Sequence, residues 1–199
     1  MRRIGLLAVL TMGVPGRAEA HLVGVALGDF YAGTLHLLSS PGDLALLAVV
    51  GLLVAAQTRV TGQAALLALP LGLVLGVLVV WAELPLPAAE PWVALCLGFG
   101  GLATALALRL PGSVTTTFTG AAGALIGASN AVAAFDGGVN WALYGSGVVA
   151  AGTVLGTLGI AVLATLYAWR RWVPLAQRVL ASWFAAAGAM VFGLSFAGI

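Results

Sequence analysis

Six apolar segments of near-membrane length follow one another along most of this chain, separated by short turns rich in polar residues, proline and glycine. A helix needs about 20 apolar residues to cross the hydrocarbon core of a bilayer. The segments show no alternation of apolar and polar residues, so they predict helices and not the strands of an outer-membrane barrel. The predicted helices cover about residues 41–57, 61–81, 90–109, 114–134, 139–169 and 173–197.

The composition indicates that this chain folds in a lipid bilayer. With 62% hydrophobic and 7% charged residues, the chain lacks the polar side chains that a water-exposed surface needs. We therefore interpret it as an all-α, polytopic integral membrane protein whose residues 21–199 form a single transmembrane domain within the lipid bilayer. The single Cys96 excludes an internal disulfide. A net charge of only +2, without a basic tract, indicates no nucleic-acid partner.

Residues 1–20 have the organisation of a secretory signal peptide. A basic start at residues 2–3 precedes a short apolar core at 4–14, and 18–20 form a small-x-small cleavage site, Ala-Glu-Ala. Cleavage after Ala20 would make His21 the new amino terminus, where the amine and the imidazole together form a potential metal chelate. An uncleaved anchor is the alternative interpretation.

Segment 22–38 is apolar but short, and Asp29 interrupts it. We predict a re-entrant or interfacial helical element in the outer leaflet, because only then do all arginines after the signal peptide lie inside. The protein would then be a multi-pass protein of the bacterial inner membrane, with both mature termini in the periplasm. The inner ends would carry Arg59, Arg109, Arg170, Arg171 and Arg178, and the outer ends Asp29, Asp43, Glu83, Glu90 and Asp136.

The break after this segment holds the residues that most suggest a function. His36 lies among leucines, Ser39-Ser40-Pro41-Gly42 ends the helix, and Asp43 opens the next one. Ionisable groups are costly in lipid and therefore indicate a site. Imidazole and carboxylate suit a divalent first-row ion, with nickel, cobalt, copper and zinc all possible, and an Asp/His pair also fits a proton relay. The candidate metal-binding residues on the outer side are His21, Asp29, His36, Asp43 and Asn130.

Each candidate also has a structural role open to it. Asp29 could be a helix-end charge among the lipid headgroups, and Asp43 could cap the helix that it opens. Asn130 could bond a neighbouring helix, and His36 could bond a backbone carbonyl at the break. We expect no enzyme, because the chain has no recognisable nucleophile motif, P-loop or zinc-protease signature.

Glycines recur at a spacing of four residues on three of the predicted helices. This small-xxx-small spacing lets helices approach closely in lipid and predicts a tightly packed bundle. The same faces could pack against a membrane-protein partner or a second copy. The pairs are Gly72 and Gly76, Gly123 and Gly127, and Gly152 and Gly156.

The stretch from Ala20 to Gln57 resembles the HupE/UreJ family, small membrane proteins encoded with hydrogenases and ureases and regarded as nickel or cobalt permeases. Members have a cleaved signal ending before a His, a re-entrant segment with the motif His-Pro-x-x-Gly-x-Asp-His, and a helix ending in Ala-Ala-Gln. Here the mature start is Ala20-His21, the motif reads His36-Leu-Leu-Ser-Ser-Pro-Gly-Asp43, and the helix ends in Ala55-Ala56-Gln57.

The chain departs from the family pattern at several positions. Without a gap, His36 matches the first His of the motif, Gly42 takes the place of its Asp, and Asp43 takes the place of its second His. A second family motif, His-Gly-x-Ala-His-Gly, corresponds to residues 126–131, where Asn130 replaces the second His and Ile126 replaces the first. In the fifth spanning helix, Gly156 stands where a His is common.

The resemblance implies a membrane permease or delivery protein for a divalent transition-metal ion of the nickel/cobalt class, with its site at the periplasmic face. A carboxylate at position 43 would shift such a site towards harder ions. Two alternatives stay open: a non-transporting structural or accessory subunit of a membrane complex, and a channel for a small solute or protons.

Overall fold

The computed structural model describes residues 28–84 and 88–196, and all regular secondary structure in these ranges is α-helical. The all-α prediction is confirmed. The predicted signal peptide of residues 1–20, its cleavage after Ala20, and His21 lie outside the described residues. The helices are α3 (Asp29–Ser39), α4 (Pro41–Ala55), α5 (Arg59–Trp81), α6 (Ala89–Ala105), α7 (Gly112–Gly137), α8 (Trp141–Trp169) and α9 (Val173–Phe196).

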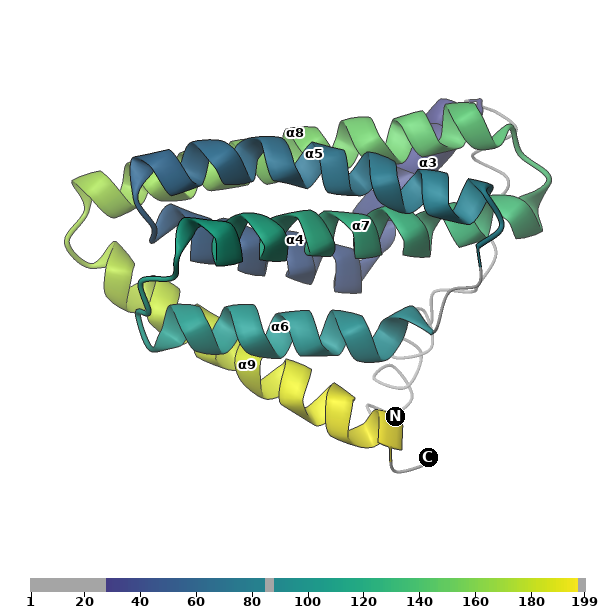
Figure 1. The fold of residues 1–199 in the computed structure, drawn as a ribbon. Helices are drawn as coiled ribbons and strands as arrows, with labels where there is room; N and C mark the ends of the chain where they lie inside the picture. The colour runs from purple at the N-terminus through teal and green to yellow at the C-terminus, as the bar shows by residue number, and fades with distance from the viewer. Residues whose placement is uncertain (1–27, 85–87, 197–199) are drawn as a thin grey trace, which may run out of the picture.

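Helices α3 and α4 form a pair bent by 72° at Ser40. Pro41 is the first residue of α4; it has no N–H to donate and favours an extended conformation for the residue before it. Ser40 is accordingly extended, and its hydroxyl caps α4 by accepting from the backbone N–H of Asp43 at 3.4 Å. The bend lies within the length of the bundle and not at either end (Figure 1).

Helices α5, α8 and α9 are each long and apolar enough to cross a membrane, and α3 with α4 would make a fourth span if the bent pair counts as one. Helices α4 and α6, of 15 and 17 residues, are about 22 and 26 Å long at 1.5 Å per residue. The hydrocarbon core is about 30 Å thick, so they are short for independent spans. The six-span arrangement stays a prediction.

The charges separate to the two ends of the bundle. The loops α4–α5, α6–α7 and α8–α9 lie together at one end, whereas α3 and α6 begin at the other (Figure 1). The first end, here called the arginine end, carries Arg109, Arg170 and Arg171. The opposite end, here called the carboxylate end, carries Asp29, Glu83 and Glu90.

At the arginine end, Gln57 forms hydrogen bonds with the end of α4 and with the α6–α7 loop. Its Nε2 donates to the carbonyls of Leu53 and Leu108 at 3.2 and 3.3 Å, and its Oε1 accepts from the Leu110 N–H at 3.2 Å. Arg109 donates to the carbonyl of Ala56 in the same place. Gln57 and Arg109 therefore join the α4–α5 loop to the α6–α7 loop through hydrogen bonds to backbone groups near the helix ends.

Glycines bring α5 and α7 into direct backbone contact. A methyl group added at Gly72 or Gly76 would overlap the α7 backbone, and one added at Gly123 or Gly127 would overlap the α5 backbone. In lipid, such close approach supplies the van der Waals contact that holds helices together. The predicted tight packing is therefore built within this one chain.

The glycines of α8 leave space for leucine side chains of α5. Leu73 packs against Gly152, and Leu69 packs against Gly156, close enough that an added methyl group would overlap each leucine. Both leucines are fully buried. The face of α8 that carries Gly152 and Gly156 is thus covered inside the chain and is not a free surface for a partner.

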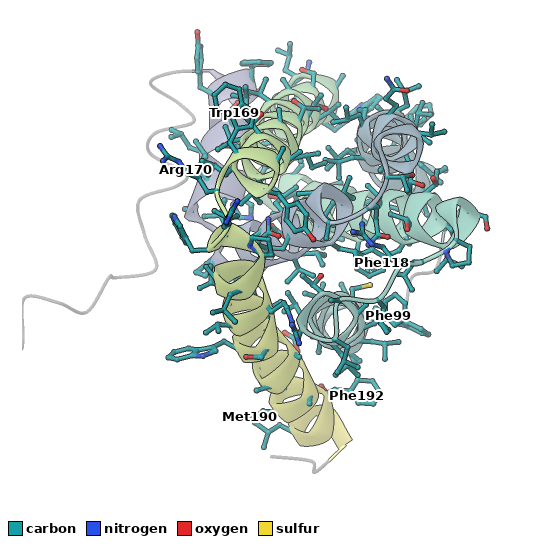
Figure 2. All side chains as sticks on the ribbon, turned by 90° about the vertical axis from the view of Figure 1, so that its left-hand side faces the viewer. Phe99, Phe118, Trp169, Arg170, Met190 and Phe192 are labelled. Carbon is teal, nitrogen blue, oxygen red and sulfur yellow. The ribbon has the colours of Figure 1, made fainter. Side chains whose placement is uncertain are left out.

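Helices α6 and α9 form a second pair beside the main bundle. Gly101 of α6 and Gly188 of α9 each lie against the backbone of the other helix. The rings of Phe99 on α6 and Phe118 on α7, 5.4 Å apart, link the pair to the bundle, and α9 extends away below them (Figure 2). Most α9 side chains are exposed, as lipid-facing residues should be.

Candidate functional site

A polar cluster lies inside the bundle at the α3–α4 break. We define it as His36, Asp43, Ser129, Asn130 and Tyr144. Asp43, in the first turn of α4, is 6% exposed, and Asn130 of α7 is 1% exposed. The Asn130 Nδ2 donates to Asp43 Oδ2 at 2.6 Å and to the Ile126 carbonyl at 2.9 Å. The buried carboxylate is therefore held by an amide from another helix.

Ser129 lies beside the other oxygen of this carboxylate. Its Oγ is 3.4 Å from Asp43 Oδ1 and 3.1 Å from the Ile126 carbonyl, and its single proton can serve only one of them at a time. The hydrogen-bond partners of the Asp43 side chain within the described chain are thus neutral. Buried charges are normally paired with an opposite charge or a metal. The amino terminus of α4 offsets part of this negative charge.

Tyr144 of α8 lies beside His36 and within electrostatic range of the Asp43 carboxylate. The rings of His36 and Tyr144 are 6.1 Å apart, and the Tyr144 phenol is close enough to Asp43 for the two to interact electrostatically. The Tyr144 hydroxyl and the Asn130 Oδ1 are buried and have no hydrogen-bond partner among the described residues. Buried polar atoms normally bind a water or another polar group. These two oxygens are therefore available to a polar ligand.

Glycine places Tyr144 beside α3. Gly33 lies against the backbone of Tyr144, and Gly147 lies against the backbone of Phe30, so an added methyl group at either would overlap the other helix. Thr34 Oγ1 approaches the Gly147 carbonyl at 3.3 Å. The two helices therefore cross closely enough for His36, one turn further along α3, to reach the Tyr144 ring.

The structure separates the sequence-predicted residues. Asp29 lies at the carboxylate end, where its Oδ2 accepts from the backbone N–H of Asn140 at 2.8 Å. His36, Asp43 and Asn130 lie in the polar cluster, and His21 lies outside the described residues. Within the described ranges, no three His, Cys, Asp or Glu side chains gather where they could hold a metal. An ion in the cluster would therefore also need amide, hydroxyl or phenol oxygens.

Sequence reasoning missed Ser129 and Tyr144. Ser129 precedes Asn130 in the second motif region and could have been included on that ground. Tyr144 lies in the first turn of α8. No sequence pattern indicates that it belongs to the cluster, because its position there depends on the crossing of α3 and α8.

The fold and the cluster define an all-helical membrane protein in which a broken helix places a buried carboxylate beside polar groups from two other helices. A family model described as HupE / UreJ protein matches residues 8–191, and the chain belongs to this family. Membership implies a metal-related accessory or permease role in a membrane. No curated protein and no solved structure showed a significant match to the chain.

Proposed function

We propose that this protein is a permease or delivery protein for a divalent transition-metal ion of the nickel/cobalt class, acting from the periplasmic face of the bacterial inner membrane. Family membership supports the metal-related role. The observation that carries the proposal is the buried carboxylate of Asp43, whose described hydrogen-bond partners are neutral and which lies at a helix break near Tyr144 and His36.

The donor set of the cluster combines one imidazole with oxygens. His36 would supply nitrogen, Asp43 the anionic oxygen, and Asn130 and Tyr144 the oxygens that have no other described partner. Such a set is harder than an imidazole-rich one and would hold a borderline ion less tightly. Weaker binding suits passage, because a transported ion must also leave its site.

The space beside the cluster on the side of the carboxylate end is about large enough for one water molecule. An apolar hollow of about 10 Å³ lies beside Tyr144 and is lined by residues of α5, α7 and α8. The rings of Trp81 and Trp141 stack 4.8 Å apart at its edge. By the positive-inside rule, the arginine end would face the cytoplasm and this hollow the periplasm.

Metal binding and uptake test the proposal together. Protein purified without an affinity tag is assayed for bound nickel, cobalt, copper and zinc, and proteoliposomes are assayed for uptake of the same ions. We expect His36→Ala and Asp43→Asn each to lower affinity and uptake at least tenfold. Ser182→Ala on the exposed surface of α9 is the control and should change neither. The Asp29→Asn variant shows whether the carboxylate that bonds Asn140 also contributes to metal binding and uptake.

The alternatives make different predictions in the same experiment. A structural subunit would bind no metal and take up none, with or without His36. A channel for a small solute or protons would show flux that does not depend on metal. Either result would overturn the proposal.

A further inference from the structure

A second feature lies at the arginine end, outside the polar cluster. It is a cavity of about 410 Å³ between α5 and α8, with the end of α4 as its third wall. Helices α5 and α8 touch where Leu69 packs against Gly156, but nearer the arginine end Gln63 and Leu66 of α5 and Ala161 and Ala164 of α8 line the cavity. The two helices therefore separate towards the arginine end, and the cavity occupies the space between them.

The cavity is apolar inside and polar at its mouth. Of the residues that line it, Val54 and Ile160 are buried, whereas Thr58 and Gln63 near the start of α5 and Trp169 at the end of α8 are exposed. Its volume is within the range of about 300–1,000 Å³ typical of small-molecule pockets. Aromatic residues of this kind gather where lipid headgroups meet the hydrocarbon. The cavity thus has the polarity profile of a lipid molecule lying parallel to the helices.

Positive charge lies next to the mouth. Arg170 and Arg171 directly follow Trp169, and both are exposed. Trp169 and Arg170 lie at the end of α8, on the flank of the molecule away from Phe99 (Figure 2). The carboxylates with described side chains lie at the opposite end or, for Asp43, inside the bundle. Basic pockets between spanning helices on the cytoplasmic side bind anionic lipid headgroups.

We propose that this cavity binds an acyl chain of an anionic phospholipid whose headgroup pairs with Arg170 and Arg171. A second copy of the chain fits the charges poorly. A copy with the same orientation in the membrane would bring its own arginines to this depth, and like charges repel. An anionic lipid supplies both the apolar chain and the opposite charge.

Native mass spectrometry of the full-length protein in mild detergent tests this proposal, with phosphatidylglycerol and phosphatidylcholine added separately. We expect tighter binding of phosphatidylglycerol. Ala164→Phe, at an exposed position lining the cavity, should weaken its binding at least tenfold by filling the space. Arg170→Gln/Arg171→Gln should remove the headgroup preference, a loss of about 30-fold at about 1 kcal/mol for each arginine.

Two matched variants serve as controls. Ala187→Phe places the same bulk on the exposed side of α9, and Glu83→Gln changes a charge at the carboxylate end. Neither should alter lipid binding. Equal binding of the two lipids, or an equal loss in Ala187→Phe, would overturn the proposal. A dimer that Ala164→Phe abolishes would overturn it as well, because a second copy would then fill the cavity. The Arg170→Gln/Arg171→Gln variant tests the headgroup contact alone, because neither arginine lines the cavity.

Discussion

The side-chain amide of Asn130 in α7 donates a 2.6 Å hydrogen bond to the carboxylate of Asp43 in α4, across 87 positions of sequence. This bond joins the broken helix to the centre of the α5–α7–α8 bundle. Hydrogen bonds to a charged group contribute about 1.5–3 kcal/mol, more than those between neutral groups. The same pair that organises the candidate site therefore also stabilises the fold around it.

Asn130→Ala should lower the stability of the protein by about 1.5–3 kcal/mol, because it leaves a buried carboxylate without its shortest hydrogen bond. The measurement is the unfolding midpoint in detergent micelles. Ser129→Ala is the matched comparison and should cost less, since Ser129 Oγ lies 3.4 Å from the carboxylate and also bonds the Ile126 carbonyl. Equal losses in the two variants would contradict the importance assigned to the Asn130 bond.

Gly76→Ala should destabilise the protein, because the added methyl group would overlap the backbone of α7 at Ala124. Overpacking of this kind costs about 1–3 kcal/mol. Gly159→Ala is the control at an open helical position, where alanine should be neutral or stabilising by up to about 1 kcal/mol. Thermal unfolding of both variants gives the difference, and two variants of equal stability would be inconsistent with the α5–α7 contact.

Ala107→Gly should stabilise the protein by about 1 kcal/mol. Ala107 follows the end of α6 with φ at +54°, a left-handed conformation that costs a residue with a Cβ about 1–2 kcal/mol and glycine almost nothing. Ala105→Gly, at the last residue of α6, changes the same residue type in helical backbone and should destabilise instead. If both substitutions shifted the unfolding midpoint in the same direction, this result would argue against strain at Ala107.

Cysteine labelling should separate the two ends of the bundle by side of the membrane. In a Cys96→Ala background, a membrane-impermeant thiol reagent added to intact spheroplasts should label Ala88→Cys at the carboxylate end. It should not label Leu108→Cys at the arginine end until the membrane is opened. Both positions are exposed at helix boundaries. The reverse pattern would place the arginines outside and contradict the proposed orientation.

The sequence predicted much of the site region because its signals are local. Pro41 and the two serines before it predict a helix break, and His36 and Asp43 are ionisable residues in an otherwise apolar stretch. The roles of the other residues needed the fold. Asp29, which the sequence placed among the metal-binding candidates, bonds the Asn140 backbone at the carboxylate end. Tyr144 entered the cluster only because Gly33 lets α8 lie directly on α3.

The composition and local patterns of the sequence predicted an all-helical membrane protein with arginines and carboxylates in separate turns, and its motifs resembled the HupE/UreJ family to which the family match assigns the chain. The helical prediction follows from composition, because lipid requires each apolar segment to satisfy its own backbone as a helix. Three other features required the folded structure: Asp43 bonds Asn130, His36 lies beside Tyr144, and α5 and α8 separate around a cavity. Helix neighbours in lipid are selected by the fit of small residues against a partner surface, which no single segment contains.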